Sequence, residues 1–406
     1  MPTSRARLLT KEVYIIDGVR TPVGKFGKSL RDVHPTDLAA ITIRSLVERN
    51  QLYPDMIDLI LMGQVIRAGT GMNTAKHAAI KAGLPEDIEA SNVDMVCASG
   101  LKAIIDASIY IASGMAEIAL AGGMESMSQA PFLLPTSARW GIRYIFKEEA
   151  GIRDAMVHDG LRDPIYGGLM GEEADETAWE YNAPREELDW IAYQSHMRAA
   201  KAWDQGLFKD HVVPVEHGGR TLLDWDEGIR PDTRLEKLAS LKPVFTERGP
   251  HTAGNSSQLS DGAATVLLAS REAVERYGLK PRAVVRAWAF AGVHPKRFPV
   301  APVKAVRLLL EQLGWSVGEV DYWENNEAFA VNSLIMNRDL GVSYERLNVH
   351  GGSIAVGHPL GSTGARITIE LVNILERRQA RRGVVSICHG LGGAAAIAVE
   401  RVEAKL

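Results

Sequence analysis

The sequence predicts an α/β fold in which two similar halves flank an inserted segment. Short apolar runs alternate with helix-like runs over residues 12–128, and the same alternation returns from residue 258 onward. Residues 129–257 differ, because they hold most of the tryptophans together with many charged residues and Pro/Gly breaks. Strands separated by helical stretches are typical of βαβ units and of a largely parallel sheet.

The first half begins with apolar runs that have the length and composition of buried strands, at VYIID (13–17), LILMG (59–63), NVDMV (92–96) and EIALAGG (117–123). Helical spacing of apolar residues lies between them, at 35–50, 74–82 and 101–113. The inserted segment contains one clear amphipathic helix near 185–204. Strands return in the second half at ATVLLAS (264–270), VDYW (320–323), VVSI (384–387) and AAIAV (395–399).

These zones predict three domains along the chain. We expect an N-terminal half made of residues 1–128 and 258–280, an inserted domain over 129–257, and a C-terminal half over 281–406. In each half a buried strand runs into a small-residue turn that carries a cysteine. Since ligands of open α/β sheets bind beyond the carboxyl ends of strands, we expect the two turns to meet at the junction of the halves.

Composition excludes several functional classes. The 406 residues carry 46 Lys plus Arg against 50 Asp plus Glu, a net charge of -4, so there is no basic field for nucleic acid. Two cysteines exclude a disulfide scaffold and a Cys-based zinc site. No uncharged apolar run approaches the roughly 18 residues of a membrane span, and the N-terminus lacks the apolar core of a secretory signal. A cellular interior is expected, and a short organellar presequence stays open.

Cys97 is placed at the N-terminal end of the predicted apolar helix 101–113. The partial positive charge of a helix N-terminus lowers the pKa of a nearby thiol, which favours a reactive thiolate. Taken alone, Cys97 is also consistent with an ordinary buried cysteine. Cys388 ends a strand, and the adjacent His389 is expected to point the opposite way and not to pair with it.

His358 lies in a glycine-rich loop, GGSIAVGHPLGSTGAR (351–366), that precedes a helix. Such a loop is able to cradle phosphate, but it matches neither the Walker pattern nor the dinucleotide fingerprint. Asn326 follows the strand 320–323, where an asparagine is commonly a simple helix cap. The spacings of His211 with His217 and of His350 with His358 do not suit a metal site, so no metal is expected.

In combination these motifs resemble the thiolase family. The matching strings span roughly residues 12–401 and occur in the family's order: VCASGLKA (96–103), GGMESMSQAP (122–131), DGL (159–161), SHMRAA (195–200), TAGNSSQLSDGAA (252–264), NEAFA (326–330), NVHGGSIAVGHPLGSTGAR (348–366) and CHGLGG (388–393). The resemblance implies an α/β fold of the five-layered αβαβα type, with two similar halves and an inserted loop domain. It also implies an acyltransferase that cleaves 3-ketoacyl-CoA or condenses acetyl-CoA by reversible Claisen chemistry.

The resemblance implies a role for each residue of the motifs. Cys97 is the nucleophile that becomes acylated, His358 activates it, and Cys388 exchanges a proton with the second substrate. Asn326 holds a water in an oxyanion site with His358, and the backbone N–H groups of Cys97 and Gly390 form a second oxyanion site.

Coenzyme A binding is implied for the loop domain, as a substrate and with no resident cofactor. Arg230 and Ser257 fall at the matching positions, although a solvent-exposed arginine and a turn serine explain them equally well. The family also implies a homodimer or homotetramer that acts on CoA thioesters in fatty acid metabolism. The ending Ala404-Lys405-Leu406 resembles a peroxisomal address, but we expect a cytoplasmic enzyme.

Three departures touch the acyl-binding side. Leu169 stands where short-chain thiolases usually carry histidine, Phe298 where they carry methionine, and His389 begins the run that is usually Ile-Gly-Gly-Gly-like. They leave acyl chain length and reaction direction open. The alternatives are a non-catalytic thiolase-like subunit that binds acyl-CoA, an acyltransferase of the same fold with another acceptor, and a decarboxylating ketoacyl synthase, against which the second cysteine Cys388 argues.

Overall fold

The computed structural model describes residues 5–141 and 151–403, and its first part alternates strands with helices. These are β1 (Arg5–Arg20), β2 (Gly24–Lys25), α1 (Pro35–Arg49), β3 (Leu59–Gly63), α2 (Thr74–Lys81), β4 (Glu89–Val93), α3 (Ser99–Ser113) and β5 (Ile118–Ser126). The middle segment holds β6 (Phe132–Leu133), β7 (Arg153–Asp154), α4 (Met170–Glu180), α5 (Arg185–Asp204), β8 (Val215–His217), β9 (Arg220–Leu223) and α6 (Leu235–Ala239).

Strands and helices alternate again over the rest of the described chain. The elements are β10 (Ser260–Ser270), α7 (Arg271–Tyr277), β11 (Ala283–Gly292), α8 (Ala301–Leu313), β12 (Tyr322–Asn325), α9 (Ala330–Leu340), α10 (Ser353–Val356), α11 (Thr363–Arg377), β13 (Arg382–His389) and β14 (Gly393–Arg401). All three helices predicted in the first half are found within two residues of their expected bounds, and the predicted helix 185–204 is α5.

Ten of the strands form one sheet in the order β12-β13-β14-β11-β1-β10-β5-β3-β4, with β2 beside β10, while β6 pairs with β7 and β8 with β9 in two small separate sheets. On one side of the central β1–β11 pair, β3 and β5 are parallel and β10 is antiparallel to β5 and β1. On the other side, β12 and β13 are parallel and β14 is antiparallel to β13 and β11. The same pattern therefore repeats on both sides, as expected for two similar halves.

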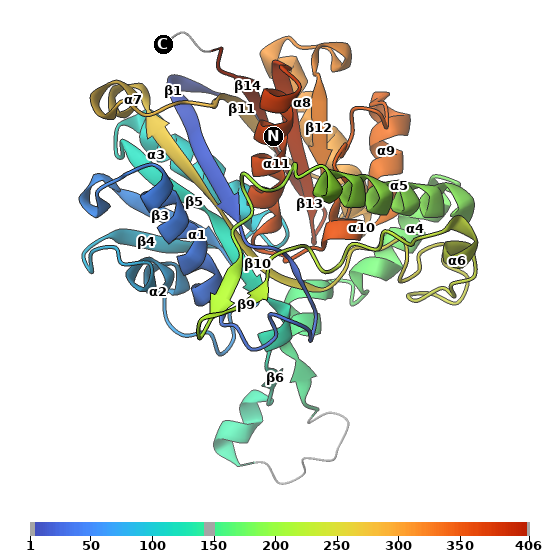
Figure 1. Ribbon diagram of the computed structural model, residues 1–406. Coiled ribbons are helices and arrows are strands. Elements are labelled where there is room, and N and C mark those ends of the chain that lie inside the picture. The colour runs from blue at the N-terminus through green and yellow to red at the C-terminus, as the bar shows by residue number, and fades with distance from the viewer. Residues whose placement is uncertain (1–4, 142–150, 404–406) are drawn as a thin grey trace.

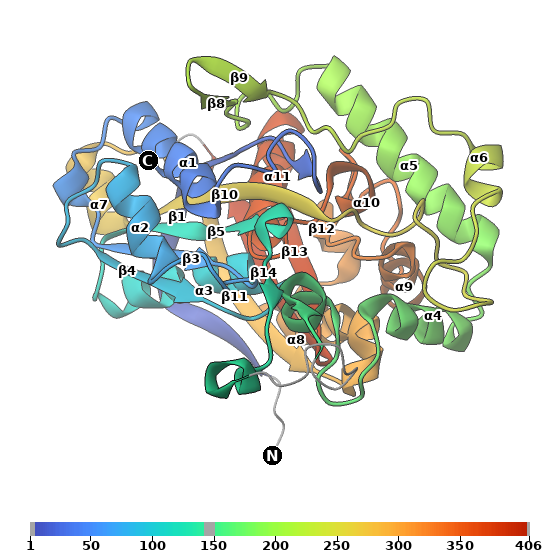
Figure 2. The same cartoon turned by 90° about the horizontal axis from the view of Figure 1, so that it is seen from below.

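Helices cover both faces of this sheet and fill its centre (Figures 1 and 2). One apolar cluster joins α3 and α11 to strands from both halves, so the sheet wraps around this helix pair. A second cluster packs α1 and α2 on the outer face of the first half, and a third packs α8 and α9 on the outer face of the second. The layers are helix, sheet, helix, sheet and helix, which confirms the predicted αβαβα architecture.

The two cysteine turns do not occupy equivalent places in the halves, contrary to the sequence pattern. Cys97 follows β4 and leads into the central helix α3, whereas Cys388 lies near the end of β13 and the chain turns back into β14. By topology, the partner of the Cys97 turn is the loop before α11, which carries His358. The domain boundaries remain a prediction.

Strand bounds shift near the motifs. The strand predicted at 92–96 is β4 and ends at Val93, because Val96 has φ 48° and leaves the extended conformation. The strand predicted at 320–323 is β12, two residues later in the chain. β11 was not anticipated, although it pairs with β1 at the centre of the sheet.

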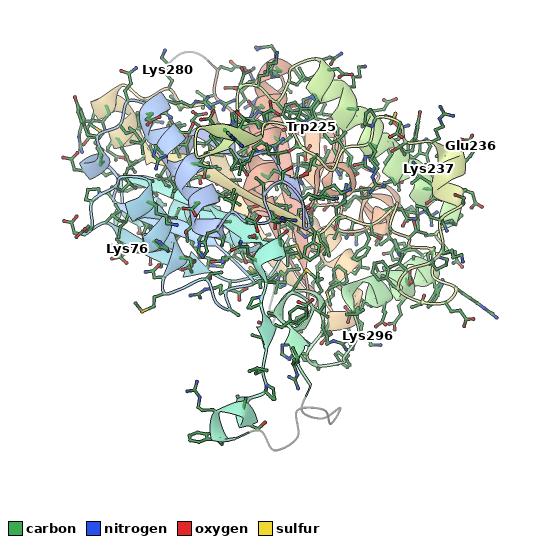
Figure 3. All side chains as sticks on the ribbon, turned by 60° about the horizontal axis from the view of Figure 1, so that its bottom comes forward. Lys76, Trp225, Glu236, Lys237, Lys280 and Lys296 are labelled. Carbon is green, nitrogen blue, oxygen red and sulfur yellow. The ribbon has the colours of Figure 1, made fainter. Side chains whose placement is uncertain are left out.

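Two surface features lie outside the layers. The hairpin of β6 and β7 projects from the body, with Phe132 and Trp140 exposed, while labelled charged side chains such as Lys76 and Lys280 point outward around the body (Figure 3). The segment Val96–Ser113 is long and apolar enough to cross a membrane, but it is mostly α3, whose residues pack between the two halves of the sheet. We assign it to the protein core.

Candidate active site

A strained turn presents Cys97 between β4 and α3. Val96 has φ 48°, a left-handed conformation that costs a β-branched residue roughly 1–2 kcal/mol. Asp94 Oδ1 accepts from Val96 N at 3.0 Å, and Ser99 Oγ donates to Val96 O at 2.6 Å while accepting from Met95 N at 2.8 Å. These side-chain bonds hold the turn in place, as expected where strain serves a site.

The Cys97 thiol is protonated in the resting site. The residue is partly accessible, yet burial of its sulfur raises the pKa to about 12, while its own N–H and that of Gly390 oppose the shift and the Glu125 carboxylate adds to it. The sequence led us to expect a lowered pKa at the helix N-terminus. Burial outweighs that effect, so the thiol requires a base to react.

Cys388 lies close to Cys97 and is buried. Burial raises the pKa of its thiol far above the ordinary value, and the nearby Cys97 raises it further. Asn332 Nδ2, in the first turn of α9, donates to Cys388 Sγ at 3.5 Å. The adjacent His389 ring bonds Gly390 O at 2.7 Å and is not the partner of this thiol. Asn332 carries no motif signal in the sequence and was missed.

His358 and Asn326 form the second part of the site. Asn326 Nδ2 lies 3.3 Å from His358 Nε2, and His358 Nδ1 lies 2.7 Å from Thr363 Oγ1. Burial and, to a smaller extent, the Arg366 guanidinium lower the pKa of His358 to about 3, so the ring is neutral. In the described part of the chain, the imidazole is not hydrogen-bonded to either cysteine.

Glu125, at the end of β5, fastens the loops around the site. Its carboxylate accepts from Val65 N at 3.0 Å, Ile66 N at 3.1 Å and Gly361 N at 2.9 Å. The side chain is fully buried, and burial raises its pKa to about 7 against these three donors. Glu125 belongs to the GGMES string, but nothing in the sequence indicated that its carboxylate would bind the N–H groups of these loops.

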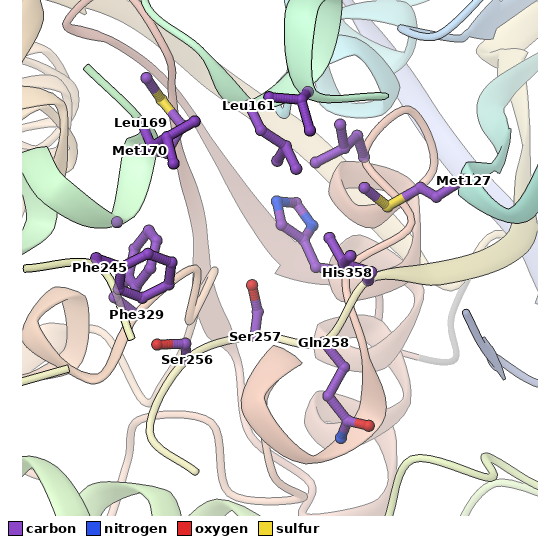
Figure 4. A pocket seen from close by; sticks show the side chains of 14 residues that line it. Met127, Leu161, Leu169, Met170, Phe245, Ser256, Ser257, Gln258, Phe329 and His358 are labelled. Carbon is purple, nitrogen blue, oxygen red and sulfur yellow. The ribbon is translucent and has the colours of Figure 1, made fainter. Parts of the chain in front are cut away.

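An apolar cavity with about 650 Å³ of empty space opens beside His358 (Figure 4). Its lining residues are Met127, Val157, Leu161, Leu169, Met170, Gly171, Phe245, Ser256, Ser257, Gln258, Leu259, Phe329, His358 and Leu360. In Figure 4 the His358 ring and the Ser257 hydroxyl reach into this space from below. Cys97 is not part of this lining, but it packs against the apolar cluster that contains two of the lining residues, Met127 and Leu360.

Ser257 and Arg230 are placed differently. Ser257 lines the cavity, and its N–H donates to Ala328 O at 2.9 Å. Arg230 is partly buried outside the cavity lining, and its backbone N–H donates to His196 Nδ1 at 3.1 Å. Burial lowers the pKa of His196 to about 3, so this ring accepts as a neutral base. The structure therefore brings one of the two expected coenzyme contacts to the cavity.

Of the three departures, one lines the cavity and the other two lie outside its lining. Leu169 lines the cavity directly, at the start of α4. Phe298 is buried and lies edge-on to Phe329, with ring centroids 6.2 Å apart. His389 is held by the Gly390 carbonyl, beside the turn that supplies the Gly390 N–H. Two other histidines of the sequence, His211 and His350, lie elsewhere in the fold. Their rings hydrogen-bond to the Glu370 carboxylate at 3.0 and 2.5 Å.

The sequence is similar to known proteins over nearly its whole length. The sequence matches the family descriptions "Thiolase, N-terminal domain" over residues 13–272 and "Thiolase, C-terminal domain" over residues 279–401. It is 43% identical to an acetyl-CoA acetyltransferase of Synechocystis over 395 residues, which is 97% of this chain and 100% of that protein. It is 42% identical to a beta-ketoadipyl-CoA thiolase of Pseudomonas knackmussii, with 97% and 100% coverage.

A solved structure shares the fold. The crystal structure of the Bacillus anthracis acetyl-CoA acetyltransferase matches with a TM-score of 0.93 at 38% identity, covering 98% of this chain and 100% of that one. The similarity extends over the two halves and the inserted segment together.

Proposed function

The chain belongs to the thiolase family of acyltransferases, and from this premise we propose that Cys97 carries the acyl group between coenzyme A and a 3-ketoacyl or acetyl unit. The observation that carries the proposal is the convergence of Cys97, Cys388 and the Gly390 N–H at one site. The reaction is thiolytic cleavage of the C2–C3 bond of a 3-ketoacyl-CoA or, in reverse, Claisen condensation of acetyl-CoA to acetoacetyl-CoA.

His358 is the base for the first step. Its neutral ring takes the proton of the Cys97 thiol, and the sulfur attacks the C3 carbonyl of a 3-ketoacyl-CoA. The N–H groups of Cys97 and Gly390 stabilise the oxyanion that forms on this carbonyl. When the tetrahedral intermediate collapses, the C2–C3 bond breaks and its electron pair goes to the acetyl-CoA enolate.

Cys388 then supplies a proton. Because burial raises its pKa, the thiol is protonated at neutral pH and can protonate the enolate carbon. Protonated His358, with a water held by Asn326, stabilises the enolate oxygen. The thiol of a second coenzyme A attacks the acyl group on Cys97, and the protein sulfur leaves as the thiol once protons are returned. Condensation runs these steps backward.

The cavity favours uncharged acyl groups. Its lining is apolar apart from the serine hydroxyls, Gln258 and the neutral His358 ring. A carboxylated chain, such as the beta-ketoadipyl group named for one relative, would leave its charge without a cation among the described lining residues. We place Ser257 on the pantetheine arm and Arg230 toward the nucleotide of coenzyme A, as a substrate with no resident cofactor.

The enzyme is proposed to act in the cytoplasm as a homo-oligomer, in fatty acid metabolism or a related thioester pathway. The curated relatives are bacterial proteins and do not support a peroxisomal address. The ending Ala404-Lys405-Leu406 that resembles such an address lies outside the described residues.

The test is CoA-dependent cleavage of acetoacetyl-CoA, repeated with longer and with carboxylated 3-ketoacyl-CoA substrates. Brief incubation with acetyl-CoA, an acid quench and peptide mass mapping should place one acetyl group on the Cys97 peptide. Since the chain has two cysteines, Cys388→Ser is the matched control. It should retain the acetyl group but lose cleavage and condensation. Acetyl-free Cys97 in an active enzyme would refute the assignment.

A further inference from the structure

A continuous chain of hydrogen bonds runs through the His358 ring. Arg366 Nη2 donates to Ser353 Oγ at 2.7 Å, and Ser353 Oγ donates to Asn326 Oδ1 at 2.6 Å. Asn326 Nδ2 lies 3.3 Å from His358 Nε2. On the far side of the ring, His358 Nδ1 lies 2.7 Å from Thr363 Oγ1, which donates to Pro359 O at 2.9 Å. Two ends of this chain have a fixed polarity.

The first fixed end is Arg366. A guanidinium has donors only, so Ser353 Oγ must accept from it and has its single proton left for the Asn326 amide oxygen. The amide oxygen of Asn326 is therefore turned away from the imidazole, and its NH₂ group faces His358. An amide nitrogen only donates, so His358 Nε2 accepts and carries no proton.

The second fixed end is the Pro359 carbonyl, which only accepts. Thr363 donates its hydroxyl proton to that carbonyl, so its oxygen accepts from His358. The proton of the neutral ring is therefore on Nδ1. Both ends lead to the same tautomer, although neither end shares an atom with the other.

Burial makes this polarity effective. Ser353 and Thr363 are completely buried, and Asn326 and Arg366 are nearly so, which leaves no bulk water to reverse a bond. Glu324, a buried carboxyl without a hydrogen-bond partner in the described chain, opposes the lowering of the Arg366 pKa by burial. Burial also raises the pKa of Glu324 well above its usual range, so the polarity of the hydrogen-bond chain rests on the donor-only guanidinium and not on this carboxyl.

We propose that Ser353 and Thr363 are positioning residues that set the tautomer of His358 and the orientation of the Asn326 amide. The inference rests on the proposed function, because it concerns the proton that the ring takes from Cys97. A ring with its proton on Nε2 has no lone pair for the thiol. Because Nε2 has one lone pair, the Asn326 N–H releases it when the Cys97 proton arrives. Both nitrogens then carry protons, and the Thr363 oxygen continues to accept from Nδ1 and so stabilises the imidazolium.

The experiment measures Cys97 acetylation by acetyl-CoA as a function of pH in Thr363→Val, Thr363→Ser and Thr368→Val. Thr368 is the matched control, because it is a buried threonine of the same helix that takes no part in the hydrogen-bond chain through His358. Its hydroxyl donates to Gly364 O at 2.8 Å. Wild type and T368V should acetylate at a rate that varies little between pH ~7 and ~9, with His358 as base.

Thr363→Val should acetylate about 10²-fold more slowly at pH ~7, the loss expected for a misplaced catalytic group. Its rate should rise about tenfold per pH unit, because the thiolate must then form without the ring. T363S should restore the rate and the flat profile. On the Asn326 side of the ring, Ser353→Ala should lower kcat and leave the KM for acetyl-CoA unchanged. Ser353→Thr should restore kcat.

The outcomes separate the two proposals. A wild-type enzyme that neither cleaves acetoacetyl-CoA nor becomes acetylated contradicts the proposed function itself. An active wild type in which T363V and T363S acetylate within twofold of each other, or in which T363V keeps a flat pH profile, overturns the positioning roles. Circular dichroism of each variant identifies a folding defect, in which case the S353A and S353T pair decides.

Discussion

At the scale of single residues, the resting site is uncharged where chemistry begins. Burial raises the pKa of the Cys97 thiol to about 12 and lowers that of His358 to about 3. A neutral thiol and a neutral base in one buried site avoid the cost of a buried ion pair until substrate oxygen enters the site. The charges then form together with the groups that stabilise them.

This balance predicts little Cys97 thiolate in the ligand-free enzyme. The thiolate absorbs in the ultraviolet, and the difference between wild type and Cys97→Ser should show no thiolate step between pH ~7 and ~10, where an ordinary cysteine ionises near ~8.5. Tyrosine ionisation is common to both proteins and cancels. A step near pH ~8 in the difference would contradict the buried, neutral thiol.

His196 predicts a pH-dependent stability. Its folded pKa of about 3 lies below the unfolded value, so the neutral ring stabilises the fold above pH ~6.5, and this contribution is lost as pH falls through that value. Between pH ~7 and ~5 the loss is roughly 2 kcal/mol. His196→Asn keeps an acceptor for Arg230 N but does not titrate.

Denaturant unfolding of wild type and H196N at both pH values measures this effect. The variant should gain roughly 2 kcal/mol relative to wild type on acidification. Buried carboxyls with raised pKa values, such as Glu125, titrate alike in both proteins and cancel in the comparison. Equal pH dependence in the two proteins would mean that His196 is protonated in the fold.

At the scale of elements, Glu125 ties three segments together. It connects the end of β5 to the loop after β3 and to the loop before α11. Glu125→Gln has one oxygen for three N–H groups, so at least one buried donor loses its partner. We expect a loss of about 1–3 kcal/mol in the free energy of unfolding.

Glu311→Gln is the control for this prediction. Glu311 is an exposed residue of α8, and such substitutions usually change stability by less than ~0.5 kcal/mol. Denaturant titrations of the two variants should therefore separate clearly. If E125Q unfolds with the same free energy as E311Q, the carboxylate does not fasten these loops.

The elements also show where sequence reasoning succeeds and stops. Periodicity predicted α5 with correct bounds, because a 20-residue amphipathic pattern is local. β4 was misplaced, since the left-handed Val96 has no signature in a run of apolar letters. Ser353, Thr363 and Arg366 carry their functions through partners that only the fold brings near, so composition and spacing contain no trace of them. The motif residues were identifiable because the family resemblance had already grouped them.

At the scale of the whole molecule, β4 is an edge strand of the ten-stranded sheet. An exposed edge strand offers unpaired backbone groups to another chain, and the family resemblance implies that a second copy pairs there. We predict a homodimer or a dimer of dimers. Light scattering at micromolar concentration should give at least twice the chain mass of 44.3 kDa. A mass of 44.3 kDa would exclude this.

The central position of β1 has a consequence for synthesis on the ribosome. Its two sheet neighbours, β10 and β11, emerge roughly 240 residues after it. At ~5–20 residues per second, the nascent chain waits roughly 12 to 50 s before its first strand finds a partner. During that interval the apolar side chains of β1 must be shielded, so chaperone supply should limit the yield of this enzyme more than the stability of its finished fold.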